Sequence, residues 1–267
     1  MRLIRGLTNL KRIAGSADSP LADGCVATIG NFDGVHRGHK TIIDQVRGKA
    51  QALNLPSVVM IFEPQPQEFF KGAEAPPRLM PFRQKFEALL GEGVDVVLCI
   101  RFDETFRNYS GMGFIEDVLI NGLGVRHLVV GDDFRFGCDR AGDFKLLQSV
   151  GQERGFTVEN TRTVMVDGER VSSTRVRNAL NVNGLEEAER LLGHPYRIHG
   201  RVVYGRQLGR QIGAPTANIL LHQMPALRGV YVVRARLDTG EWRDGVANIG
   251  LRPTVDGKRP SLEVHLF

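Results

Sequence analysis

The residues Thr28–His39, TIGNFDGVHRGH, join the end of a buried strand to a glycine-rich turn and two histidines three residues apart. Just before the turn, Val26–Ile29 is a nearly continuous apolar run, which is typical of a strand that a parallel sheet buries on both faces. After it, apolar residues recur at helical spacing from Ile42 to Leu53, which predicts an amphipathic helix over 40–53. The stretch is therefore predicted to be a strand-to-helix turn.

Such a turn directs the free N–H groups and the positive dipole of a helix N-terminus toward whatever lies above the sheet, which favours phosphate. Glycines at 30, 34 and 38 would let the backbone approach a ligand closely. His36 and His39, an i, i+3 pair in the first turn, could donate two hydrogen bonds to one phosphate group. Zinc ligation is an alternative, but no third Cys or His lies at suitable spacing.

The region from 25 to about 165 alternates between strand and helix patterns. The predicted strands are 25–29, 57–62, 94–100, 126–131 and 156–166, and the predicted helices are 40–53, 81–90, 111–121 and 143–153. This alternation predicts an α/β fold with a Rossmann-like, doubly wound parallel sheet. Ligands of such sheets bind beyond the carboxyl ends of the strands, where the opening motif lies.

Three more segments follow predicted strands or begin a helix. Residues 62–66, FEPQP, form a rigid loop or a plain turn, because two prolines fix the backbone. In 131–137, GDDFRFG, the acidic, aromatic and arginine side chains could bind a planar ring or simply fill a small core. Residues 171–177, VSSTRVR, predict a helix start whose hydroxyl groups either cap the helix or, together with Arg177, bind phosphate.

The composition changes after a predicted short helix, Leu185–Gly193. We expect one domain over 1–185, a linker over 186–198 and a second domain over 199–267. Predicted strands at 197–204, 229–233, 246–250 and 261–267 indicate a small antiparallel β-barrel. Between the first two, a glycine-rich loop precedes Thr216 and Asn218, which could hold a hard cation; a hairpin turn is the alternative.

The composition of the 267 residues, 42% apolar and 24% charged, is that of an ordinary globular protein. No apolar run approaches the roughly 20 residues that span a bilayer. The basic N-terminal stretch 1–15 lacks the apolar core of a signal peptide, so we interpret it as the first strand and its flank. Three scattered cysteines form no metal or disulfide pattern, which favours the reducing cytoplasm. The net charge of +5 suits a polyanionic partner, but without a polybasic tract it does not favour nucleic acid.

Four of these segments occur in the order found in one family. The motif at 28–39, the loop at 131–137, the Ser-Ser-Thr-x-x-Arg segment at 172–177 and the Gly-x-Pro-Thr-Ala-Asn segment at 213–218 resemble the bacterial bifunctional riboflavin kinase/FAD synthetases. The resemblance implies that the first domain adenylylates FMN with ATP to give FAD and pyrophosphate, and that the second phosphorylates riboflavin with ATP. Ala214 replaces the larger residue often found there, and family kinase domains continue beyond Phe267, so we expect an incomplete kinase domain.

The resemblance also implies a role for each motif residue. The catalytic residues would be His36, His39, Arg177 and Glu263; the nucleotide-binding residues Gly30, Asn31, Asp33, Gly34, Ser173, Thr174, Gly205 and Gly209; the flavin-binding residues Asp133, Phe134 and Arg170; and the magnesium ligands Thr216 and Asn218.

Two other functions remain open from the sequence. One is a related His-x-Gly-His nucleotidyltransferase that acts on another phosphorylated substrate, such as a pantetheine or lipid-headgroup precursor. The other is a catalytically silent flavin- or RNA-binding module. The expected partners are the small molecules ATP, riboflavin and FMN, without a membrane, and the sequence makes no prediction of the oligomeric state.

Overall fold

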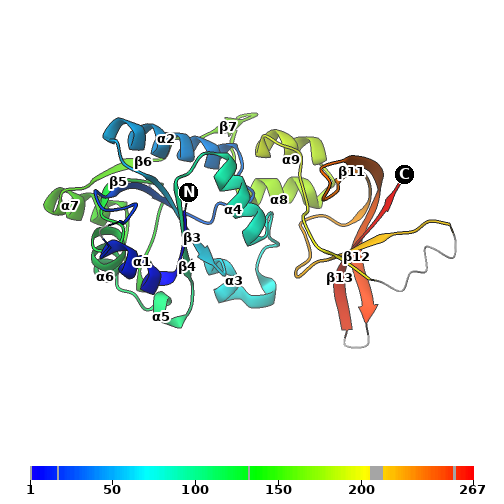
Figure 1. The fold of residues 1–267 in the computed structure, drawn as a ribbon, viewed down its shortest axis with the longest axis horizontal. Helices are drawn as coiled ribbons and strands as arrows, with labels where there is room; N and C mark the ends of the chain where they lie inside the picture. The colour runs from blue at the N-terminus through cyan, green and yellow to red at the C-terminus, as the bar shows by residue number, and fades with distance from the viewer. Residues whose placement is uncertain (1, 17, 132, 205–212, 255–256) are drawn as a thin grey trace. The chain divides into compact units, whose positions relative to one another are not determined.

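A computed structural model describes residues 2–16, 18–131, 133–204, 213–254 and 257–267 (Figure 1). The chain forms two compact units. Unit 1 comprises Met1–Pro76 and Phe82–Ser172, and unit 2 comprises Pro77–Pro81 and Ser173–Phe267. The domain bounds at 185 and 199, with a linker between them, stay a prediction.

Unit 1 is built on a six-stranded sheet in which every strand pair is parallel. The strands lie in the order β1 (Arg2–Arg5), β4 (Val96–Arg101), β3 (Ser57–Glu63), β2 (Cys25–Ile29), β5 (Val125–Val130) and β6 (Thr157–Asn160). All five residues of β2 are buried, as expected of a strand covered on both faces. The predicted doubly wound parallel sheet is confirmed.

Helices cover both faces of this sheet (Figure 1). On one face, α2 (Arg37–Leu53) packs Val46 and Ala50 against Val26 of β2. Ala27 and Ile29 of the same strand belong to the core of the other face, because alternate side chains of a strand point to opposite sides. That core includes residues of α1 (Gly6–Ala14), the π-helix η2 (Phe114–Ile120) and α7 (Phe144–Arg154). The short helices are α3 (Pro66–Lys71), η1 (Gly72–Glu74), α5 (Glu104–Arg107), α6 (Gly111–Gly113) and η3 (Cys138–Arg140), and α4 (Phe82–Gly91) is longer.

The chain reverses its direction of progress across the sheet between β2 and β5. From β2 it proceeds through β3 to β4, and it then crosses to β5 and β6 on the other side of β2. Doubly wound sheets bind their ligands at such a switch point, beyond the carboxyl ends of the strands. The loops that follow β2 and β5 flank this point, and they contain the motif 28–39 and the loop 131–137.

Three parts of unit 1 differ from the sequence prediction. The predicted strand 156–166 ends at Asn160, and the chain then forms a hairpin of β7 (Met165–Val166) and β8 (Glu169–Arg170). Its loop residues Asp167 and Gly168 both have positive φ, as in the type I′ turns that Asp-Gly pairs favour. Most of the predicted helix 111–121 is a π-helix, and the N-terminal flank after β1 is the helix α1.

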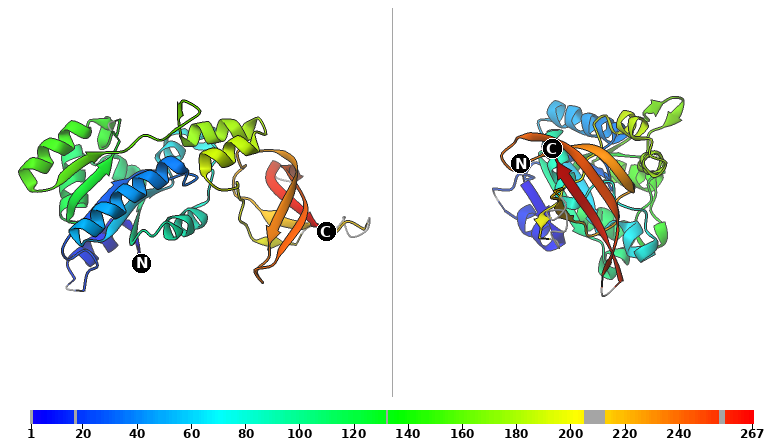
Figure 2. Two further views of the ribbon diagram at one scale, coloured as in Figure 1. Left: turned by 90° about the horizontal axis from the view of Figure 1, so that it is seen from above. Right: turned by 90° about the vertical axis from the view of Figure 1, so that its right-hand side faces the viewer.

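Unit 2 begins with α8 (Ser173–Asn181) and α9 (Leu185–Leu192), which pack against each other. A five-stranded antiparallel sheet follows, in the order β11 (Gly229–Arg236), β12 (Trp242–Thr254), β13 (Gly257–Leu266), β10 (Ala217–Leu220) and β9 (Val202–Val203). Figure 2 shows its longest strands side by side in orange and red. The predicted strand 197–204 is paired only at its Val202–Val203 end. The predicted strands 229–233 and 246–250 lie within longer ones, and 261–267 matches the end of β13 up to Leu266.

Candidate functional site

The loop after β2 makes a sharp turn that buries two apolar side chains. Phe32, Gly34 and Val35 all have positive φ, an unusual run for residues with a side chain. The side chains of Phe32 and Val35 are nevertheless almost fully buried, which anchors the turn to the sheet. The N–H of Gly30 continues the sheet by donating to the carbonyl of Met60, 3.1 Å away. The motif is thus held rigidly at the carboxyl end of β2.

His36 and His39 lie where this turn enters α2. His36 is the N-cap residue, and its Nδ1 accepts the backbone N–H of His39 at 3.3 Å. The two imidazole rings stack with their centroids 3.6 Å apart and their planes inclined by 14°. The ring of Phe32 lies 4.8 Å from that of His39. The structure therefore brings the two predicted catalytic histidines together as one stacked pair.

The hydrogen bonding and burial of the pair determine its charge. Because Nδ1 of His36 accepts a hydrogen bond, it carries no proton, so the ring is neutral and its Nε2 bears the donor hydrogen. Burial lowers the pKa of His39 well below its ordinary value, and any positive charge on His36 or Lys85 lowers it further. Lys85, on α4, is itself fully buried. The pair therefore offers neutral donor groups next to a buried cation, which suits an anionic ligand.

Two glycines of the motif make room for its own rings. A Cβ added at Gly30 would lie 3.1 Å from the ring of Phe32, and one at Gly38 would lie 3.2 Å from that of His36. The Gly38 position is also 3.5 Å from the carbonyl oxygen of Val171. Packing within the motif thus explains these glycines, while Gly34 is required by its positive φ.

The remaining predicted nucleotide-binding residues of unit 1 share the same loop. Asn31 is partly exposed. Asp33 is almost fully buried, and it interacts with other groups of the protein. Both lie within the turn that positions His36.

The predicted flavin-binding residues lie on the loop after β5 and on the β7–β8 hairpin. Asp133 and Arg170, both exposed, form an ion pair of 3.7 Å, so the structure brings these two together. Phe134 is partly buried, and its ring stacks 5.6 Å from that of the buried Phe136. Phe136 in turn packs against Phe114 of the π-helix. The aromatic residues of the loop therefore extend the core, and Phe134 lies at its edge.

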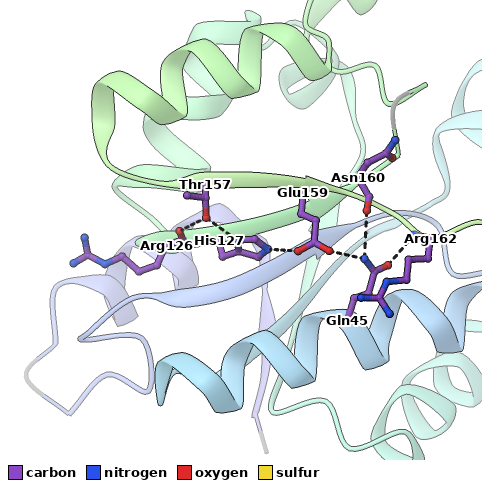
Figure 3. Close-up of polar contacts among 7 residues, drawn as sticks. All are labelled: Gln45, Arg126, His127, Thr157, Glu159, Asn160 and Arg162. Carbon is purple, nitrogen blue, oxygen red and sulfur yellow. Dashed lines mark hydrogen bonds and ion pairs between the residues drawn. The ribbon is translucent and has the colours of Figure 1, made fainter.

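A hydrogen-bond network that the sequence did not indicate joins α2 to β5 and β6, the last two strands of the parallel sheet (Figure 3). The side-chain Nε2 of Gln45 donates to Glu159 at 2.9 Å, and its Oε1 accepts the backbone N–H of Arg162 at 2.8 Å. Beneath them, the buried His127 lies between Thr157 and Glu159, with distances of 2.6 and 3.2 Å. The network fixes the segment that leads from β6 to the hairpin against the helix that carries the histidines.

The predicted phosphate-binding residues Ser173, Thr174 and Arg177 lie in unit 2, at the start of α8. The helix begins at Ser173, as predicted, and Thr174 is exposed. The Nε of Arg177 donates to the carbonyl of Pro77 at 2.8 Å, which fixes the direction of its guanidinium group.

The antiparallel sheet of unit 2 places three polar residues in one row across neighbouring strands. Glu263 of β13 pairs with Asn218 of β10 on one side and with Asn248 of β12 on the other. Directly paired residues of adjacent strands point to the same face. Sequence reasoning named Glu263 and Asn218 but missed Asn248, because only the strand register reveals it.

His265 connects this row to the loop that precedes β10. Its Nδ1 donates to the carbonyl of Pro215 at 2.8 Å, and Pro215 is followed by the exposed Thr216. His265 and Glu263 are two residues apart on β13 and so point to the same face. Gly205 and Gly209 lie outside the described residues, as does most of the loop around them.

Comparison with known proteins matches each of the two units to a protein family. The family model described as FAD synthetase matches residues 18–175, and the one described as riboflavin kinase matches residues 192–267. A protein of Pseudomonas fluorescens named bifunctional riboflavin kinase/FMN adenylyltransferase is 54% identical over 269 residues, covering 100% of this chain and 83% of its own length. The chain belongs to this bifunctional family. A Haemophilus influenzae member with the same name is 50% identical, with 100% and 84% of the two chains covered.

A solved structure has the same fold as this family member. It is described as a macrolide-efflux protein from Streptococcus pneumoniae, and it aligns with a TM-score of 0.80 and 27% identity over 100% of this chain and 85% of its own. Within the described ranges, none of the helices has the length and apolar character that crossing a membrane requires. The FAD synthetase match includes His36, His39 and the Asp133–Arg170 pair, whereas the riboflavin kinase match includes Asn218 and Glu263.

Proposed function

We propose that this chain makes both flavin cofactors: it phosphorylates riboflavin to FMN with ATP, and it adenylylates FMN with ATP to FAD and pyrophosphate. Membership of the bifunctional family supports both reactions. The observation that carries the adenylylation is the stacked pair of His36 and His39 at the N-terminus of α2, beyond the carboxyl end of β2. The domain bounds of 1–185 and 199–267, and a cytoplasmic location, are part of the same proposal.

In adenylylation, a phosphate oxygen of FMN attacks the α-phosphorus of ATP, and the bond from that phosphorus to the oxygen that bridges it to the β-phosphate breaks. No protein group forms a covalent bond, so catalysis consists of positioning and of stabilising charge. Nε2–H of His36 donates to the phosphoryl oxygens of ATP. His39, the second catalytic histidine, also stabilises the ATP phosphates and the transition state. The turn that contains Gly30, Asn31, Asp33 and Gly34 forms the nucleotide pocket.

Further residues hold the two substrates of this step. Arg177 binds phosphate oxygens as the third catalytic group, and Ser173 and Thr174 donate their hydroxyl hydrogens to phosphates. Asp133, Phe134 and Arg170 contact the flavin. The Asp133–Arg170 ion pair supports a common role for the loop after β5 and the β7–β8 hairpin.

In the kinase reaction, Glu263 accepts the proton of the terminal ribityl hydroxyl, whose oxygen attacks the γ-phosphorus of a second ATP and releases ADP. Thr216 and Asn218 hold Mg²⁺, which would neutralise phosphate charge. The side-chain oxygens of Thr216 and Asn218, which are two residues apart in the sequence, suit a hard cation. Gly205 and Gly209 contact the nucleotide.

Chromatography of the flavins after incubation with ATP and Mg²⁺ tests the proposal. FAD formed from FMN would establish the adenylyltransferase, and FMN or FAD formed from riboflavin would establish the kinase. If FMN is not converted while another phosphorylated substrate is adenylylated, the chain would be a different His-x-Gly-His nucleotidyltransferase.

A further inference from the structure

Gln65 lies in the loop after β3, between Pro64 and Pro66, with only 5% of its surface exposed. It is the N-cap of α3, and it forms a reciprocal capping box with Glu68. Its side-chain oxygen accepts the N–H of Glu68, and its own N–H donates to the Glu68 carboxylate at 2.8 Å. The first of these bonds fixes the orientation of the carboxamide, because a flipped amide would set its NH₂ group against the N–H of Glu68, which is also a donor.

The NH₂ group of this carboxamide is a donor that has no acceptor in the part of the chain that the structure describes. The other backbone groups of this loop cannot serve as the donor instead. Neither proline has an N–H, and the backbone N–H of Gln65 already donates to the Glu68 carboxylate. Nε2 of Gln65 is buried and has no hydrogen-bond partner among the described residues. Because buried polar groups are almost always paired, such an atom next to a binding site indicates a missing acceptor.

The position of Gln65 indicates where that acceptor comes from. Strands β2 and β3 are direct neighbours, so the loops that follow them leave the same edge of the sheet side by side. On the β2 side of this edge, Nδ1 of His39 is also buried without a partner among the described residues. The fully buried Lys85 adds a positive charge that acts on His39. These surroundings favour an anionic acceptor.

We propose that Nε2–H of Gln65 donates a hydrogen bond to a phosphoryl oxygen of FMN or ATP in the adenylylation site. This makes Gln65 a substrate-binding residue, and the inference rests on the proposed adenylylation. Because Nε2 is closed off from solvent in the free chain, the carboxamide or its loop moves slightly when the substrate binds. Gln65 is then satisfied only in the complex, so binding and a local rearrangement are coupled.

The side-chain amide of Gln65 can be observed directly by ¹⁵N NMR, with its resonance assigned from its loss in Gln65→Met. We expect the resonance to shift on addition of ATP alone or of FMN alone. The substrate that causes the shift is the one whose phosphoryl oxygen accepts the hydrogen bond from Gln65. Riboflavin, which lacks the phosphate, is the control for FMN. A resonance unchanged by both ATP and FMN would overturn the proposal, whether or not the chain forms FAD.

Kinetics provide the second test. Gln65→Glu keeps the capping oxygen and the volume but exchanges the donor for an acceptor. We expect the KM of FMN adenylylation for the contacted substrate to rise about 10- to 100-fold, the scale of one hydrogen bond to a charged group. Riboflavin phosphorylation should be unchanged.

Glu68→Ala is the matched control, since it breaks the capping box and leaves Nε2 of Gln65 in place. It should leave the KM unchanged. Equal KM values for Gln65→Glu and the unmodified chain would contradict the proposal, as would an equal rise in Glu68→Ala. If the unmodified chain forms no FAD, the proposed function itself fails, and the NMR titration still decides the role of Gln65.

Discussion

The rings of His36 and His39 stack 3.6 Å apart while Nδ1 of His36 accepts the N–H of His39. These two contacts connect helix capping to the protonation of the proposed catalytic group. A protonated Nδ1 could not accept the hydrogen bond, so an intact cap keeps His36 neutral with its proton on Nε2. The same local geometry that begins α2 thus prepares a hydrogen-bond donor for phosphate.

Replacing His36 separates these two roles. Asn is among the best N-cap residues, so His36→Asn should preserve α2 and remove the imidazole donor. We expect FMN adenylylation to fall about 100-fold or more, the scale of losing one preorganised donor to a developing charge. The measurement is the rate of FAD formation at saturating ATP and FMN. Near-normal turnover in His36→Asn would show that the residue is needed only as a cap.

Two glycines on α2 form a matched pair for a second prediction. Gly38→Ala places a Cβ 3.2 Å from the His36 ring, whereas Gly48→Ala meets no atom within 4 Å. Both changes favour the helix, and Gly48→Ala should stabilise the protein by about 0.5–1 kcal/mol. We expect only Gly38→Ala to lower the kcat of adenylylation, because the His36 ring must shift by a few tenths of an ångström. Equal activities of the two variants would argue against a strict requirement for the ring position.

The lowered pKa of His39 predicts a pH dependence of stability. Below its ordinary pKa of 6.5, the unfolded chain binds a proton at this residue that the folded chain does not bind. The free energy of unfolding should therefore fall as the pH is lowered from 7 to 5, and His39 should contribute nothing to the pH dependence well above 6.5.

His39→Gln removes this contribution and should flatten the profile, measured as the urea midpoint at each pH. Some dependence should remain, because burial and the charge of Lys49 also lower the pKa of His127, an effect that Glu159 partly offsets. A profile identical to that of the unmodified protein would contradict the assignment of a buried, neutral His39.

The network around Gln45 gives a prediction that needs no substrate (Figure 3). Gln45→Leu removes the acceptor of the Arg162 N–H, so this amide should exchange its hydrogen faster. Gln51→Leu, the same substitution at an exposed position of α2, is the control and should leave the exchange unchanged. Equal protection of Arg162 in both variants would show that Gln45 does not hold the segment in place.

Sequence reasoning predicted the sheet of unit 1 because its strands are short apolar runs separated by amphipathic helices. It extended the strand after Phe156 too far, because apolar residues recur as far as Val166, whereas the chain leaves the sheet at Asn160. The π-helix was read as an ordinary helix, because residue spacing alone does not distinguish the two. The Asp167-Gly168 hairpin turn was visible in the sequence, and the strand prediction obscured it.

The site could be predicted where a motif is continuous in the sequence. His36 and His39 were found because they share one helical turn. The Gln45–Glu159 hydrogen bond joins residues 114 positions apart, and Asn248 meets Glu263 only through strand register, so neither pattern is local. For Gln65 the sequence indicated a rigid loop or a plain turn. Only the hydrogen bonding of the folded chain shows which donor of Gln65 has no partner among the described residues.

The central claim is that two separate sites perform two reactions, and a pair of variants tests it most directly. FAD formation from FMN and FMN formation from riboflavin are measured by chromatography for the unmodified chain, His36→Asn and Glu263→Gln. We predict that His36→Asn loses only adenylylation and that Glu263→Gln loses only riboflavin phosphorylation. Loss of both activities in either variant, with its fold intact by circular dichroism, would contradict the division into two sites.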